Sequence, residues 1–157
     1  MKFIAAHMAF ASISAIAILL LYAHYSDRVV MAQQHTPVAA TRLYTGADGL
    51  SHTEQIELKF SPVPGTPATV GQSEPVKVTD AYVVRLASGF FEGWHNADKR
   101  RYVVTLSGRA EIEVANGQKI SLEPGQIALA EDVTGKGHTS RVVGDKDWVA
   151  LFVDFAQ

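Results

Sequence analysis

The 157-residue sequence contains no cysteine. A disulfide framework, a thiolate metal site and a cysteine nucleophile are therefore excluded. The formal net charge is only −2, and the basic residues form no stripe interleaved with aromatic residues. A nucleic-acid partner is not expected from such a charge pattern. Beyond the first segment the chain also lacks any stretch with a convincing helical period, so helices are not expected there.

The first segment is an almost unbroken apolar run from Phe3 to Ala23, with His7 as its only ionisable interruption. About 20 apolar residues are enough to span a bilayer. Val30 and Ala32 follow at the spacing of a cleavage site. Residues 1–32 are thus either a cleaved signal peptide or a retained anchor, a hydrophobic leader helix that contacts the membrane only through residues 3–23. Both alternatives predict export, with the rest of the chain periplasmic or anchored to the inner membrane facing the periplasm.

The segment of residues 33–75 is expected to form a linker and an N-terminal strand arm. Residues 33–42 have mostly polar or small side chains, which indicates a linker. Residues 52–60 alternate apolar and polar side chains, which predicts a half-buried strand. Residues 61–75 contain four prolines and two glycines and are expected to be a loop.

From Val76 onward the pattern is that of short strands with frequent turns. The Asn116-Gly117 pair is the strongest two-residue hairpin signal in the chain. The stretch "GFFEGWH", residues 89–95, is expected to be a turn region. This rhythm predicts an all-β sandwich or barrel over residues 76–157. The expected strands are residues 78–88, 101–106, 109–115, 118–122, 127–131, 138–143 and 148–155.

Two motifs within this region resemble those of a small single-domain cupin. In the first, five residues separate Gly89 from His95, and Gly108 stands where the motif's last glycine belongs. In the second, a Pro-Gly turn leads to "AEDVTGKGH", which ends on His138 and is similar to an uncharacterised cupin subgroup. The resemblance covers residues 80–157. It implies a double-stranded β-helix, or jelly roll, and by family analogy a homodimer.

The resemblance also implies a metal site with two histidines and a glutamate from the first motif and a histidine from the second. His95 and His138 match, but Ala97 and Arg101 replace the other two ligands. One hypothesis is therefore an enzyme that acts on a small organic acid or carbonyl compound. It would hold one divalent Fe, Ni, Mn or Zn with His95, His138 and a carboxylate from Glu131 or Asp132. Glu92, three residues before His95, is a further carboxylate within reach.

A second hypothesis is a metal-free cavity that binds an anionic small molecule. Arg101 would hold a carboxylate, and His95 or His138 would move a proton beside a carbonyl group. Trp94 and His52 are the expected ligand contacts at the rim. A third hypothesis is a structural role without a ligand. The first two hypotheses depend on a closed β-cavity that brings positions 95 and 138 together.

Overall fold

The computed structural model describes residues 37–67 and 69–156, and every regular element in these ranges is a β-strand. The predicted all-β class is thereby confirmed for this part of the chain. No helix long and apolar enough to cross a membrane occurs among the residues described. The predicted leader, residues 1–32, lies outside them.

Eight strands, β5 to β12, form a jelly roll. They pair as nested antiparallel partners: β8 with β9, β7 with β10, β6 with β11, and β5 with β12. This nesting is that of one long hairpin rolled into two sheets. The strands are β5 (Val78–Leu86), β6 (Phe91–His95), β7 (Arg101–Ser107), β8 (Ala110–Val114), β9 (Lys119–Leu122), β10 (Ile127–Glu131), β11 (His138–Val142) and β12 (Trp148–Phe155).

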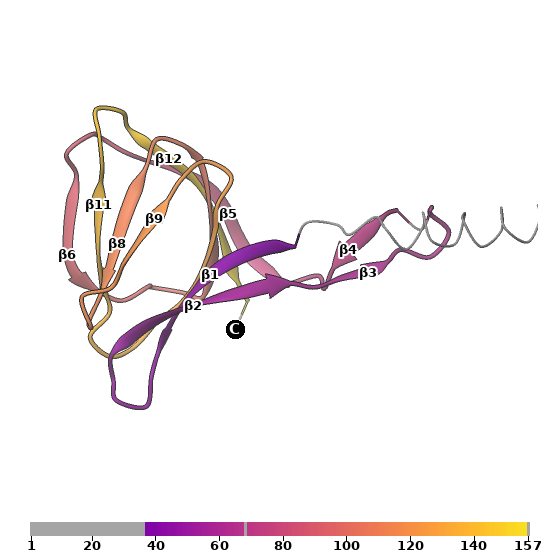
Figure 1. The fold of residues 1–157 in the computed structure, drawn as a ribbon, viewed down its shortest axis with the longest axis horizontal. Helices are drawn as coiled ribbons and strands as arrows, with labels where there is room; N and C mark the ends of the chain where they lie inside the picture. The colour runs from indigo at the N-terminus through magenta and orange to yellow at the C-terminus, as the bar shows by residue number, and fades with distance from the viewer. Residues whose placement is uncertain (1–36, 68, 157) are drawn as a thin grey trace, which may run out of the picture. The chain divides into compact units, whose positions relative to one another are not determined.

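The two sheets face each other across an apolar core (Figure 1). One contains six strands in the order β2-β1-β10-β7-β12-β5, and the other four in the order β6-β11-β8-β9. Strand alternation sends one set of side chains inward, as in β12, where Trp148 and Ala150 are buried. The core cluster consists of Leu43, Val103, Ala110, Ile112, Val114, Leu122, Ala128, Val142, Trp148 and Ala150.

An N-terminal hairpin extends the larger sheet. Its strands β1 (Val38–Thr45) and β2 (Ser51–Leu58) pair with each other, and β1 runs parallel to β10. The hairpin therefore covers an edge that β10 would otherwise expose. The strand expected over residues 52–60 is confirmed as β2. The expectation of a linker over residues 33–42 is wrong for residues 38–42, because this segment pairs with β10 as part of strand β1.

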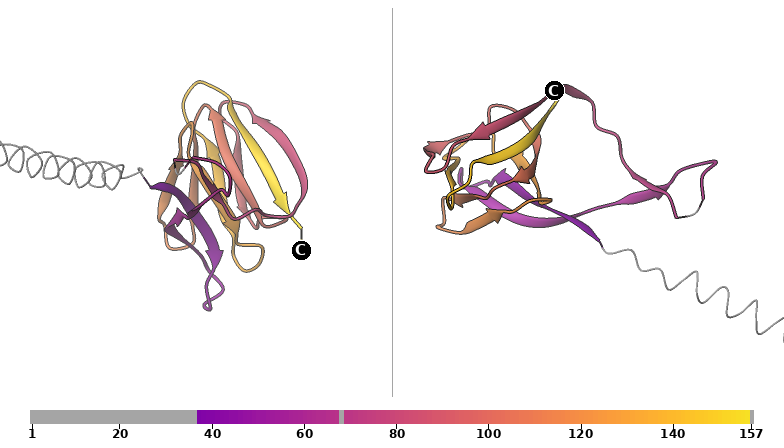
Figure 2. Two further views of the ribbon diagram at one scale, coloured as in Figure 1. Left: turned by 90° about the vertical axis from the view of Figure 1, so that its right-hand side faces the viewer. Right: turned by 90° about the horizontal axis from the view of Figure 1, so that it is seen from above.

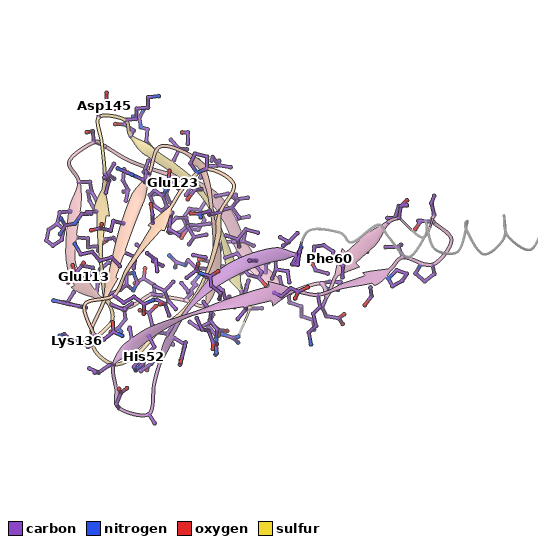
Figure 3. The ribbon with its side chains drawn as sticks, viewed as in Figure 1. His52, Phe60, Glu113, Glu123, Lys136 and Asp145 are labelled. Carbon is purple, nitrogen blue, oxygen red and sulfur yellow. The ribbon has the colours of Figure 1, made fainter. Side chains whose placement is uncertain are left out.

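A second hairpin, β3 (Phe60–Pro62) with β4 (Gly71–Ser73), follows β2. The expected loop over residues 61–75 thus contains a short ribbon, because only one of its four prolines, Pro62, lies within a strand, at the end of β3. All residues of β3 and β4 are exposed. Figure 3 shows Phe60 on this ribbon, away from the two-sheet barrel, and Figure 2 shows the ribbon itself in two further views.

Two local differences concern the smaller sheet. Residues 91–95, expected to be a turn region, form the edge strand β6. The predicted hairpin at Asn116-Gly117 is present between β8 and β9. Gly117 alone has a positive φ there, 83°, and no non-glycine residue of the described ranges does. The turn is therefore not the type I′ form, which needs positive φ at both central residues.

Candidate functional site

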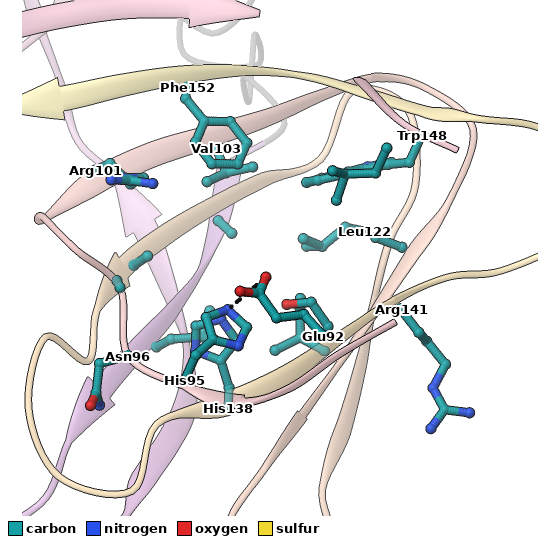
Figure 4. A pocket seen from close by; sticks show the side chains of 18 of the residues that line it. Glu92, His95, Asn96, Arg101, Val103, Leu122, His138, Arg141, Trp148 and Phe152 are labelled. Carbon is teal, nitrogen blue, oxygen red and sulfur yellow. Dashed lines mark ion pairs between the residues drawn. The ribbon is translucent and has the colours of Figure 1, made fainter. Parts of the chain in front are cut away.

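A cavity of about 220 Å³ lies between the two sheets. Most of its wall is apolar, as expected for a small-molecule site. Its polar side chains come from β6, β7 and β11 and from the segment between β6 and β7 (Figure 4). The lining residues that matter for the argument are Glu92, His95, Arg101, His138, Trp148 and Phe152.

The two predicted histidines meet in this cavity. His95 ends β6, His138 begins β11, and the two residues are direct cross-strand partners. Their ring centroids lie 4.4 Å apart. A register shift between β6 and β11 follows immediately, so that Glu92 pairs with Ser140. A bulge of this kind re-aims side chains, and it puts both Glu92 and His95 on the cavity wall.

A glycine makes the close pairing of these strands possible. Gly137 has a φ of 71°, in the region that favours glycine. A Cβ atom at this position would collide with the carbonyl oxygen and carbon of His95. The glycine before His138 therefore allows the backbones to approach each other where the two imidazoles are presented.

His138 is oriented by a buried carboxylate. Its Nδ1 lies 2.6 Å from Asp132 Oδ2, and the same oxygen accepts a hydrogen bond of 2.9 Å from Ser51 Oγ. Asp132 and Ser51 are fully buried. Because a carboxylate oxygen accepts, Nδ1 of His138 donates, and Nε2 carries the lone pair of the neutral ring. Ser51 contacts Asp132 rather than Nε2, so this is not the arrangement of a serine nucleophile.

His95 has the same tautomer for a different reason. Its Nδ1 lies 2.7 Å from the carbonyl oxygen of Gly93, which can only accept. Its Nε2 lies 3.5 Å from Glu92 Oε2. In their neutral forms the two imidazoles offer Nε2 lone pairs in one cavity, where they can accept hydrogen bonds from a ligand or take a proton.

Arg101 faces the cavity from β7, on the wall opposite the histidines (Figure 4). Its Nε lies 2.9 Å from Asp154 Oδ1, without the alignment of a hydrogen bond. Its guanidinium lies over the ring of Phe152, 5.2 Å from the centroid. Ala97 also lines the cavity. The two positions that depart from the cupin ligand pattern therefore both belong to the wall.

Glu131 is not brought to the histidines, in contrast to the predicted metal set. It is held by Arg42 Nε at 2.6 Å and by Arg100 Nε at 2.9 Å. Burial alone would raise the pKa of Glu131, but these hydrogen bonds and charges outweigh it and hold the pKa below its ordinary value. Strand alternation explains the placement: Ala130 and Asp132 point inward, so Glu131 points outward.

The two predicted rim contacts also lie elsewhere. Trp94 is 45% exposed, and Lys136 Nζ lies 4.3 Å from its ring centroid. His52 pairs with Asp48 at 3.1 Å and packs against Tyr44. The hydrogen bond from His52 lowers the pKa of Asp48. Neither Trp94 nor His52 lines the cavity.

The metal-ligand set predicted from the sequence is not assembled in the cavity. Of the four predicted ligands, only His95 and His138 offer a donor atom to the cavity, because Asp132 lies behind His138 and Glu131 is bound to arginines. No group of three metal-ligating side chains occurs among the residues described. Catalytic metals usually keep three protein ligands.

Two functional positions were missed from the sequence. Ser51 carries no local signal, because it reaches Asp132 only through the pairing of β1 with β2 and β10. Asp154 did carry a signal: it is a single carboxylate in the otherwise apolar segment "WVALFVDF", and it is 2% exposed. An acidic residue on the inward face of a strand requires a cationic partner.

No family model matches the chain, and no curated protein matches it. Solved structures do match it. A cupin-2 domain protein of Shewanella frigidimarina is 13% identical, with 84% of this chain and 92% of that chain covered and a TM-score of 0.38. A Cupin_2 domain of an XRE family transcriptional regulator of Enterobacter cloacae is 20% identical, with 50% and 82% covered and a TM-score of 0.38.

KdgF of a Halomonas species is a third such structure, 17% identical, with 73% of this chain and 87% of that chain covered and a TM-score of 0.37. The jelly roll that the motifs predicted is confirmed by the nested strand pairing of this chain itself. Similarities of this degree say nothing about ligand or activity.

Proposed function

We propose that the cavity binds a small organic molecule without a metal and directs a polar atom of that molecule at the two imidazoles. The observation that carries this proposal is the orientation of His138. Its Nδ1 is bound to the buried Asp132, and its ring stands 4.4 Å from that of His95 in an otherwise apolar cavity. A few fixed polar groups in an apolar pocket are the usual features of a small-molecule site.

The same arrangement supports proton transfer beside a carbonyl group. Nε2 of His138 takes the proton, and Asp132 stabilises the imidazolium that forms. His95 offers a second nitrogen on the same side of the cavity. Isomerisation and elimination both use such a step, and a purely binding role uses the same contacts without it.

A thermal-shift screen of the purified protein against small carbonyl compounds, alcohols, amides and acids tests the proposal. A ligand present at a hundred times its dissociation constant stabilises the folded state by about 2.7 kcal/mol. We expect His138→Ala to abolish the shift. His52→Ala is the matched control, because His52 lies outside the cavity. If no compound stabilises the protein, the proposal is wrong.

Metal analysis of the same preparation tests the competing hypothesis. A metal centre is favoured by one feature, the two imidazole Nε2 atoms that share the cavity. About one Fe, Ni, Mn or Zn per chain, lost in His138→Ala, would establish that centre and contradict metal-free binding. We expect binding of the organic ligand to persist after dialysis against a chelator.

We also propose that the folded part of the chain is exported, on the basis of the apolar run Phe3–Ala23 and the cleavage-like spacing of Val30 and Ala32. N-terminal sequencing of the mature protein distinguishes the two forms of this proposal. A start at Gln33 indicates a cleaved signal, and a start at the initiator indicates an anchor. Recovery of the protein from the cytoplasm alone would contradict both.

A further inference from the structure

We propose that the cavity selects an uncharged ligand, such as an amide, ketone or alcohol, and disfavours small carboxylates. This inference rests on the proposed function, since it specifies the class of molecule that the cavity takes. It differs from the expectation drawn from the sequence, in which Arg101 holds an anion. The difference follows from the partner that the fold gives to Arg101.

The charge of Arg101 is already matched by a buried carboxylate. Arg101 and Asp154 are cross-strand partners on β7 and β12, and both side chains point inward. Asp154 is 2% exposed and lies 2.9 Å from Arg101 Nε. The ring of Phe152 covers a face of the guanidinium. Arg101 therefore remains a hydrogen-bond donor, but the pair as a whole carries no net charge.

Lys99 does not restore a positive charge at this wall. Its Nζ lies 3.5 Å from Asp154 Oδ2, but it lies closer, 3.1 Å, to Asp80 Oδ2. Lys99 and Asp80 are both surface residues that neutralise each other. The network of these four side chains is therefore balanced, with equal numbers of cations and anions.

Besides the histidines, the remaining charged side chains on the cavity wall are Glu92, Asp98 and Arg141. Glu92 lies beside His95, and the exposed Asp98 lies 4.0 Å from Arg101 Nη2. Arg141 lines the cavity too, but its guanidinium contacts Glu111 and the ring of Phe91 and points away from the histidines (Figure 4). A carboxylate ligand near the imidazoles would therefore lie close to the carboxylate of Glu92, and like charges in a partly desolvated site repel each other.

An uncharged ligand has no such penalty and can use every polar group present. A carbonyl oxygen can accept a hydrogen bond from the Arg101 guanidinium, and an amide or hydroxyl group can donate to Nε2 of His95 or His138. The apolar part of the ligand would pack against Trp148 and Phe152.

Calorimetric titration with matched probes tests this inference. The probes are benzoate, benzamide and benzylamine, with acetate and acetamide as a smaller pair. We expect the amides to bind the wild-type protein at least about tenfold more tightly than the corresponding carboxylates. Asp154→Asn frees the charge of Arg101 and should increase carboxylate affinity by about tenfold. Amide affinity should change little.

A second variant covers the case in which Asp154→Asn does not fold. Asp98→Asn removes an acidic group that is almost fully exposed and is not expected to affect folding. It should increase carboxylate affinity in the same direction, by a smaller factor. Asp145→Asn, outside the cavity, is the control.

The possible outcomes are distinct. Carboxylates that bind the wild-type protein as tightly as amides, or benzylamine as the tightest probe, would overturn the selection of uncharged ligands and leave the proposed binding function intact. If no probe binds, and the broader screen also finds no ligand, the proposed function fails and this inference fails with it.

Discussion

Asp132 determines which nitrogen of His138 faces the cavity. Replacing it with asparagine tests the effect of its charge at nearly constant side-chain size. The asparagine side chain would retain the shape but lose the charge that fixes the Nδ1 donor. We expect Asp132→Asn to lower the free energy of unfolding by about 1–3 kcal/mol, because buried polar partners lose a hydrogen bond. Urea denaturation measures this change, with Asp145→Asn as the exposed control.

The tautomer of His138 provides a readout that a loss of stability alone would not change. In the wild-type protein, nitrogen chemical shifts should report the proton on Nδ1, and in Asp132→Asn they should report a mixture of tautomers. An unchanged tautomer in the variant would show that Asp132 does not orient the ring.

Glu131 gives the protein a pH-dependent stability. Its pKa is lower in the folded state than in the unfolded chain, because Arg100 and Arg42 outweigh the effect of burial. The stabilisation is therefore complete above the unfolded pKa and is lost as the pH falls through the folded value. The difference in melting temperature between wild type and Glu131→Gln should be largest near pH 7 and should shrink as the pH falls below the ordinary pKa of a glutamate. A constant difference across this range would contradict the argument.

Single residues also show where sequence reasoning succeeds and fails. His95 and His138 were predicted to meet, and they do. The prediction succeeded because the spacing of the turn glycines indicates the strand topology, and the topology determines where the two histidines lie. Glu131 and Asp132 are adjacent in the chain, so at most one can face inward. The sequence cannot reveal which, because the choice depends on the register with β7. Ser51 depends on a long-range pairing and has no local signal.

At the scale of elements, the approach of β6 to β11 depends on Gly137. Alanine at this position meets both an unfavourable φ and a collision with the backbone of His95. Gly117→Ala is a matched control, because Gly117 has a similar φ of 83° but open space around its Cβ position. We expect Gly137→Ala to destabilise the protein by about 2 kcal/mol more than Gly117→Ala, since only the former must move a backbone. Chemical denaturation measures the difference, and equal effects would contradict the proposed close approach.

The strands themselves were predictable where one face is buried. The expected segments over β7, β8, β10 and β12 alternate buried and less buried positions, or are largely buried, and this pattern gives a clear signal. The edge strand β6 is exposed along most of its length and contains a glycine, so it has no such pattern. The same reason explains β3 and β4, in which every residue is exposed.

At the scale of the whole molecule, the hairpin of β1 and β2 belongs to the same compact unit as the barrel over residues 76–157. The hairpin of β1 and β2 supplies Leu43 to the core and Ser51 to Asp132, and β1 covers β10. A chain of residues 37–157 should unfold cooperatively. A chain of residues 76–157 should melt about 10 °C or more lower, or aggregate, because it loses a buried leucine and exposes a sheet edge.

Circular dichroism melting and size-exclusion chromatography of the two fragments measure this difference. Equal melting temperatures would show that the hairpin is dispensable. Loss of ligand binding by the shorter fragment at a temperature where it remains folded would show that Ser51 and its strand contribute to the site itself.

The nested pairing of β5 to β12 has a consequence for how such a chain can change in length. His95 and His138 are equally distant along the chain from the Asn116-Gly117 turn, and the partners of the other nested pairs are nearly so. Residues gained or lost at the centre of this palindrome-like arrangement leave every outer partnership in place. An insertion in only one half of this series shifts the register of every strand pair outside it. A register shift of one residue turns an inward-facing side chain outward. His95 and His138 would then no longer be cross-strand partners, although neither residue had been substituted.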